Sequence, residues 1–175
     1  MKNLIILISI LIVVSSCSRK YFTPDLRSKL IENKIPLNKI QFYSNKKIKI
    51  YREINESDIN IKNGIIKHED GKILNVIILK RRIPGICIAD STNILNICFD
   101  SDDSKYFEFY SDWSDIDSKT KAFQIFFDDS NNSLKYGKDT FKIYDKYKNA
   151  KLQIRKSDIN VLEINKEKLK GRKVQ

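Results

Sequence analysis

Apolar residues are arranged in different ways along the chain, and each arrangement predicts a different structure. Residues Leu4 to Val14 form an apolar run that only Ser9 interrupts. The run has 11 residues, whereas a helix that spans a membrane needs about 20. Together with the positive charge of Lys2, this short run predicts a secretory signal peptide rather than a permanent membrane anchor.

An amphipathic helix is predicted shortly after the leader. The sequence Thr23-Pro24-Asp25 combines a capping residue, a proline suited to the first helical position and an acid that complements the helix dipole. The helix is expected to run to about Asn33, before Pro36. Its apolar side chains share one face and its charged side chains lie elsewhere: Leu26, Leu30 and Ile31 against Arg27, Lys29 and Glu32.

From Lys39 onward, apolar and polar residues alternate with the period of β-strands. Asp70-Gly71 gives the clearest hairpin signal, and Ser44-Asn45 and Pro84-Gly85 mark further turns. The predicted strand-forming segments are 40–54, 59–69, 72–79, 86–99, 106–110, 122–127, 140–144, 150–155 and 159–164. About ten short strands joined by polar turns predict a mainly β fold, a single antiparallel barrel- or sandwich-like domain with one N-terminal helix.

The domain organisation follows from these segments. Residues 1–16 are the predicted signal peptide, 17–22 a tether, 23–165 the β domain with its helix, and 166–175 a charged tail. Removing the leader leaves 159 residues, a length at which about 70% of the unfolded chain's surface can be buried. The interior is either packed with apolar side chains or left open for one small apolar ligand, and the sequence does not choose between them.

The apolar run is followed by Val14-Ser15-Ser16-Cys17, which resembles the lipobox of bacterial lipoproteins. In that family the cysteine thiol receives a diacylglycerol, the leader is removed just before the cysteine, and the new amino group is usually acylated with a fatty acid such as palmitate. The resemblance implies that Cys17 is the lipid-bearing first residue. In cells with two membranes, Ser18 in place of an aspartate favours the outer membrane.

Charge sets the expected partners. The net charge of +11 becomes +10 without Lys2, because 33 − 22 changes to 32 − 22. This surplus favours anionic headgroups or envelope polymers, although the simpler interpretation is a solvated basic surface. Nucleic acid is not an expected partner of an exported protein, and the sequence does not indicate an oligomeric state. The densest basic cluster, Lys80-Arg81-Arg82, either binds an anion or protects a solvated strand end.

Two further cysteines flank a predicted hairpin whose turn is Asp90-Ser91-Thr92-Asn93. With the turn centred between Thr92 and Asn93, Cys87 and Cys98 lie opposite each other and can form a disulfide, which export permits. A register shifted by one residue places them on opposite faces as buried free thiols. Both alternatives stay open on sequence alone.

Catalytic and metal-binding patterns are weak. His68 lacks a nucleophile elbow or triad pattern around it, and the segment Asp128 to Asp139 approaches calcium-loop spacing with Ser133 at the glycine position. We therefore expect no cofactor, no metal and no catalytic residue. The expected function is a lipid-anchored cell-envelope lipoprotein with a non-catalytic binding or structural role. The alternatives are a carrier or sensor of a small apolar ligand and a carboxylate-dependent hydrolase of envelope polymers, using residues such as Asp100 or Asp115.

Overall fold

The fold is described from a computed structural model of the chain, covering residues 18–55, 65–69, 71–112 and 120–159. The predicted signal peptide, Cys17, Trp113, the predicted strand end at 160–164 and the charged tail lie outside these residues. No helix among the described residues has the length and apolar character needed to span a membrane.

The described residues are mainly β-strand. The helical elements are α2 (Pro24–Glu32), η2 (Leu37–Lys39) and η5 (Asp145–Tyr147). The strands are β1 (Arg19–Tyr21), β2 (Phe42–Ser44), β3 (Ile48–Ile54), β4 (Ile65–Glu69), β5 (Lys72–Leu79), β6 (Pro84–Asp90), β7 (Ile94–Cys98), β8 (Tyr106–Tyr110), β9 (Gln124–Ile125), β10 (Ser133–Tyr136), β11 (Asp139–Ile143) and β12 (Leu152–Arg155).

Two antiparallel sheets make up the β structure. The seven-stranded sheet has the order β1-β12-β2-β6-β7-β8-β9, and the five-stranded sheet has the order β10-β11-β3-β5-β4. Neither order of named strands closes into a barrel. The larger sheet nevertheless curls strongly, because hydrogen bonds join the segment around β9, the last strand in the order, to the start of β12, the second. Ile125 N donates to Ala150 O and Leu152 N donates to Phe123 O, each at 2.8 Å. The prediction of a mainly β, antiparallel fold is confirmed, and its barrel form is not.

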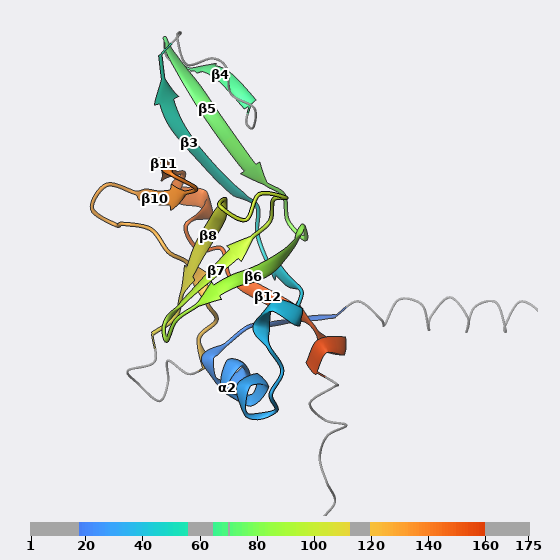
Figure 1. Ribbon diagram of the computed structural model, residues 1–175. Coiled ribbons are helices and arrows are strands. Elements are labelled where there is room, and N and C mark those ends of the chain that lie inside the picture. The colour runs from blue at the N-terminus through green and yellow to red at the C-terminus, as the bar shows by residue number, and fades with distance from the viewer. Residues whose placement is uncertain (1–17, 56–64, 70, 113–119, 160–175) are drawn as a thin grey trace, which may run out of the picture.

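The smaller sheet gives the molecule an elongated shape. In Figure 1, β3 and β5 run side by side as a long ribbon that extends away from the end where α2 and β12 lie. The edge strand β4 pairs with β5 on this ribbon, and all its residues are exposed. The Asp70-Gly71 hairpin is confirmed for its described part, since β4 and β5 pair up to Glu69 and Lys72 and Gly71 has a positive φ of 72°.

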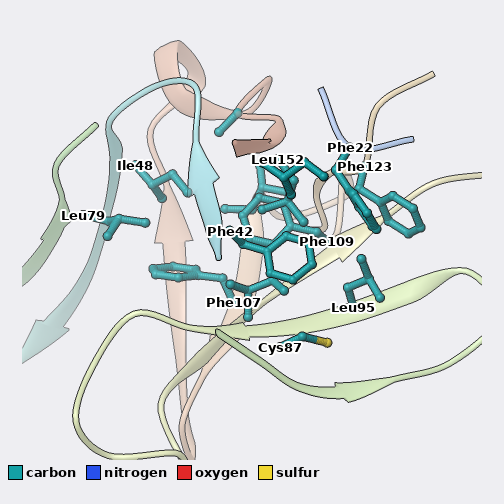
Figure 2. Packing of buried hydrophobic residues seen from close by; sticks show 14 of the residues in the cluster. Phe22, Phe42, Ile48, Leu79, Cys87, Leu95, Phe107, Phe109, Phe123 and Leu152 are labelled. Atoms are coloured by element: carbon teal, nitrogen blue, oxygen red, sulfur yellow. The ribbon is translucent and has the colours of Figure 1, made fainter. Parts of the chain in front are cut away.

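One apolar core joins the two sheets. Aromatic rings fill it, and Figure 2 shows Phe22, Phe42, Phe109 and Phe123 gathered around Leu152, with Ile48 and Leu79 approaching from the smaller sheet. Phe22 packs edge-on against Phe42 with ring centroids 5.0 Å apart. Because the first core residue is Phe22, the chain from Ser18 onward contains the whole core of the described domain.

Helix α2 covers one end of this core through an unexpected residue. Thr23 Oγ1 caps the helix by accepting from Leu26 N, as the sequence predicted. Arg27, predicted on the polar face, is instead buried, whereas Ile31, predicted on the apolar face, is exposed. The Arg27 guanidinium donates to Asp90 Oδ2 at 2.7 Å and to Thr92 O at 2.6 Å. The helix is thus joined to the β6–β7 turn by a buried cation.

The chain also departs from the prediction near its described ends. The predicted tether 17–22 contains β1, whose Tyr21 pairs with Gln153 of β12, so the folded domain begins at Arg19. Ile159, the first residue of the predicted strand 159–164, instead lies in a helical turn at 156–159. Strand β10 was not predicted, because Ser133–Tyr136 has a polar composition and is held mainly by its partner β11.

Candidate functional site

Two arginines converge on one tyrosine ring on the outer face of the larger sheet. The guanidinium carbon of Arg19 lies 4.2 Å from the centroid of the Tyr43 ring, and that of Arg155 lies 5.5 Å from the same centroid. The three residues belong to the neighbouring strands β1, β2 and β12. We call Arg19, Tyr43 and Arg155 the arginine cluster.

The strand register places the whole cluster on one face. Arg19 lies directly opposite Arg155, and Tyr43 lies directly opposite Gln153, two residues before Arg155. Because side chains alternate between faces along a strand, Arg155 and Gln153 point the same way. The intervening Ile154 is completely buried in the core. The arginines therefore lie on the outer surface of the sheet.

The electrostatics of the cluster favour a negatively charged ligand. Among the described residues, no carboxylate oxygen lies within 4.0 Å of either guanidinium group. Like charges directly opposite each other on neighbouring strands are destabilising. The Tyr43 ring offsets part of this cost, since its face attracts a cation. An anion between the two guanidinium groups would offset more, and arginine binds phosphate and carboxylate oxygens through paired N–H donors.

Exposed apolar and aromatic side chains surround the cluster on the same face. Tyr21 lies opposite Gln153 and is 49% exposed, and Ile86 of β6 is 44% exposed. Gln41 reaches across to β6, where its Nε2 donates to Gly85 O at 2.8 Å. The register places Arg19 opposite Arg155 in one row and aligns Tyr21, Gln153, Tyr43 and Pro84 in the next row of the same face, and neither row contains an acidic residue. Ile86 lies two residues after Pro84 on β6 and therefore shares this face.

The arginine cluster was not predicted, because its members are far apart in the chain. Arg19 was assigned to a tether, and Arg155 ended an ordinary predicted strand. Only the pairing of β1 and β2 on either side of β12 brings them together. A usable signal was present, since each arginine is at a position that alternates with apolar core residues.

The basic cluster that the sequence did single out lies elsewhere. Lys80, Arg81 and Arg82 form an exposed turn between β5 and β6, where Arg82 has a positive φ of 69°. In the antiparallel pairing of β2 with β6, Pro84 lies opposite Tyr43. The turn just before Pro84 therefore lies beside the Ser44 end of β2. The arginine cluster extends toward the other end of β2. The two groups of cations are therefore separate, and anion binding by Lys80, Arg81 and Arg82 stays a prediction.

The possible disulfide between Cys87 and Cys98 is not formed. Both residues are buried free thiols. Cys98 pairs with Ile86, and Cys87 pairs with Ile97, so the two cysteines are offset by one residue and point to opposite faces. Burial raises the pKa of the Cys87 thiol to about 11. It also raises the pKa of Cys98. Both are therefore poor nucleophiles near neutral pH.

The predicted acidic segment shows local capping rather than a cage of ligands. Asp128 Oδ1 accepts from Ser130 N at 2.9 Å and from Ser130 Oγ at 2.7 Å, and these bonds lower the pKa of Asp128. Asp139 forms an ion pair with Arg52 at 2.9 Å, and Asn132 Oδ1 accepts from Lys148. Within the described residues, no group of three or more histidine, cysteine and acidic residues is placed to hold a metal.

The other candidates for chemistry lie apart from one another. His68 is exposed on the edge strand β4, opposite Ile73 of β5. Asp100 is exposed in the turn after β7, where its backbone carbonyl accepts from Cys98 Sγ, and Asp115 lies outside the described residues. A groove of about 400 Å³ beside Tyr51 and another of about 420 Å³ beside His68 open to the surface. The apolar core is occupied by buried side chains.

Comparison of the chain with protein-family models, with curated proteins and with solved structures finds no significant match.

Proposed function

We propose that the mature chain is a bacterial lipoprotein, anchored in the cell envelope by a lipid on Cys17, with a non-catalytic binding or structural role. The observation that carries the proposal is the closeness of the folded domain to the lipobox cysteine. Strand β1 begins at Arg19, two residues after Cys17. A lipid on Cys17 would hold a sandwich-like β domain directly at a bilayer, because two residues span at most about 7 Å.

The strength of attachment follows from lipid chemistry. Each buried methylene contributes about 0.8 kcal/mol, and one myristoyl chain gives only reversible binding. The two or three chains of a bacterial lipoprotein therefore anchor it stably. Ser18 after the cysteine favours the outer membrane in cells that have two.

The packing of the domain supports a binding or structural role over the carrier of an apolar ligand. The rings of Phe22, Phe42, Phe109 and Phe123 are buried together in the apolar core. The ribbon of β3 and β5 extends away from the end that carries β12 and α2 (Figure 1). A protein anchored near β1 would present this ribbon and its exposed edge strand β4 as a surface for other envelope components.

Metabolic labelling with a palmitate analogue tests the proposal. The parent protein is expected to carry the label and to sediment with membranes, and the Cys17→Ala variant is expected to do neither. The variant Cys98→Ala is the matched control, since it removes a cysteine that the proposal leaves unmodified. Labelling of Cys17→Ala, or an unlabelled parent protein, would contradict the proposal.

The carrier alternative has its own test. A fragment beginning at Ser18 contains the complete core and can be titrated with a fluorescent fatty acid. The packed interior predicts no saturable uptake. Saturable binding at one site per chain would instead favour the carrier.

A further inference from the structure

We propose that the outer face of β1, β12, β2 and β6 docks onto the anionic phospholipid headgroups of the bilayer, with Arg19 and Arg155 binding headgroup phosphates. The inference rests on the proposed function for its orientation, because the lipid on Cys17 brings this face to the membrane. Its ligand chemistry is independent of the lipid and follows from the residues of the face itself.

The positive charge of the outer face is suited to an anionic bilayer surface. Arg19 and Arg155 lie directly opposite each other and both approach the Tyr43 ring. Among the described residues, neither has a carboxylate partner within 4.0 Å. Lys20 and Lys156, the chain neighbours of the two arginines, add positive charge at the same end of the sheet. A headgroup phosphate between the two guanidinium groups would offset their repulsion and accept their N–H groups.

The outer face combines aromatic, aliphatic and positively charged side chains. Tyr21 and Ile86 are large, exposed side chains on the same outer face as the arginines. Tyrosine is characteristic of the membrane–water interface, because its ring is apolar and its hydroxyl is polar. The aliphatic stems of the arginines can also contact apolar surface while their charged heads stay hydrated. The face therefore suits an interface better than bulk water.

The lipid-bearing residue is close to the arginine face. Cys17 and Arg19 are separated by Ser18 alone, so their Cα atoms lie at most about 7 Å apart. Arg19 is held by the pairing of β1 with β12, and Phe22, the residue that follows β1, donates from its N to Leu152 O at 2.9 Å. A lipid-bearing Cys17 therefore leaves this end of the sheet little freedom to move away from the bilayer surface.

The test uses vesicle co-sedimentation of the fragment from Ser18, which has no lipid of its own. Vesicles of phosphatidylcholine with phosphatidylglycerol are compared with vesicles of phosphatidylcholine alone. Binding is expected only to the anionic vesicles and is expected to weaken as salt is added. Since a basic residue near an anionic surface contributes about a fivefold change in binding, the double variant Arg19→Gln/Arg155→Gln should bind about 30-fold more weakly.

The double variant Lys135→Gln/Lys138→Gln is the matched control. It removes two positive charges from exposed positions in and beside β10, on the other sheet. Its binding should stay within about threefold of the parent fragment, since it leaves the arginine face intact. Thermal unfolding of each variant should confirm that the fold is retained.

Three results would overturn the inference. The first is that the fragment does not bind the anionic vesicles, and the second is that the two double variants lose vesicle binding equally. The third is that inorganic phosphate displaces the fragment from the vesicles at constant ionic strength. The last result would assign the cluster to free phosphate rather than to a bilayer. None of them bears on the lipid at Cys17, which palmitate labelling tests separately.

Discussion

The contact between α2 and the β6–β7 turn gives a direct test of how burial determines the contribution of an ion pair to the free energy of unfolding. Two cations of helix α2 form ion pairs with the same N–O distance of 2.7 Å, Arg27 with Asp90 of β6 and Lys29 with Asp25 of the helix itself. Their environments differ. The Arg27 side chain is 6% exposed, whereas the side chains of Lys29 and Asp25 are 58% and 54% exposed. Equal geometry is therefore expected to give unequal stabilisation.

Substituting Arg27→Met keeps the aliphatic stem and removes the guanidinium group. The change deletes the donors to Asp90 Oδ2 and to Thr92 O. A hydrogen bond that involves a charged group contributes about 1.5–3 kcal/mol, and breaking a fully buried ion pair costs about 3–5 kcal/mol. Because Asp90 is 46% exposed, it can regain water, so we expect a loss of about 2–3 kcal/mol in the free energy of unfolding.

Lys29→Met is the matched control, with an expected loss of about 0.3–0.5 kcal/mol. Urea unfolding of the fragment from Ser18 measures both. With a slope near 2 kcal/mol per molar, the midpoint should fall by about 1–1.5 M for Arg27→Met and by about 0.2 M for the control. Adding Asp90→Asn to Arg27→Met should cost much less than adding it to the parent. Equal midpoints for the two single variants would refute the reasoning.

Two further predictions concern β6 and β7. Gly85→Ala should destabilise the domain by about 1–3 kcal/mol, because an added Cβ would lie 2.5 Å from the Phe99 ring. In the control Gly71→Ala the added Cβ meets no atom within 4 Å, so the variant should lose only the free energy that the positive φ of residue 71 costs an alanine. A smaller loss of stability for Gly85→Ala than for Gly71→Ala in thermal unfolding would contradict this packing. Cys87 and Cys98 should resist iodoacetamide at pH 8 in the native protein, because burial raises the pKa of both thiols, and the rate for Cys87 should rise as the pH approaches 11. Both should react after unfolding without reductant, and a native mass lower by two hydrogens would instead indicate the disulfide.

Local sequence signals predicted the elements whose stability is local. The Thr23-Pro24-Asp25 start gave α2, and the strands Lys72–Leu79 and Tyr106–Tyr110 occur with the predicted bounds. These segments combine a clear period with a cap or turn at their ends, so neighbouring residues determine them. Strand β9 was overestimated, as only Gln124–Ile125 of the predicted 122–127 is strand.

Long-range contacts decided what the sequence could not predict. Arg27 is buried because Asp90 and Thr92, more than sixty residues away, supply its acceptors. The cysteine register follows from an irregularity between Cys87 and Ala89, which no turn signal at residues 90–93 encodes. Arg19 and Arg155 meet only because β1 joins the sheet beside β12.

The central claim is that Cys17 carries a lipid and is the first residue of a domain that folds from Arg19 onward. The intact mass of the native product, extracted from membranes of the cell that makes it, tests this most directly. The account predicts an amino terminus at Cys17 and a mass increased by a diacylglyceryl group, with or without one further acyl chain. A product that keeps residues 1–16, or that has an unmodified Cys17, would contradict it.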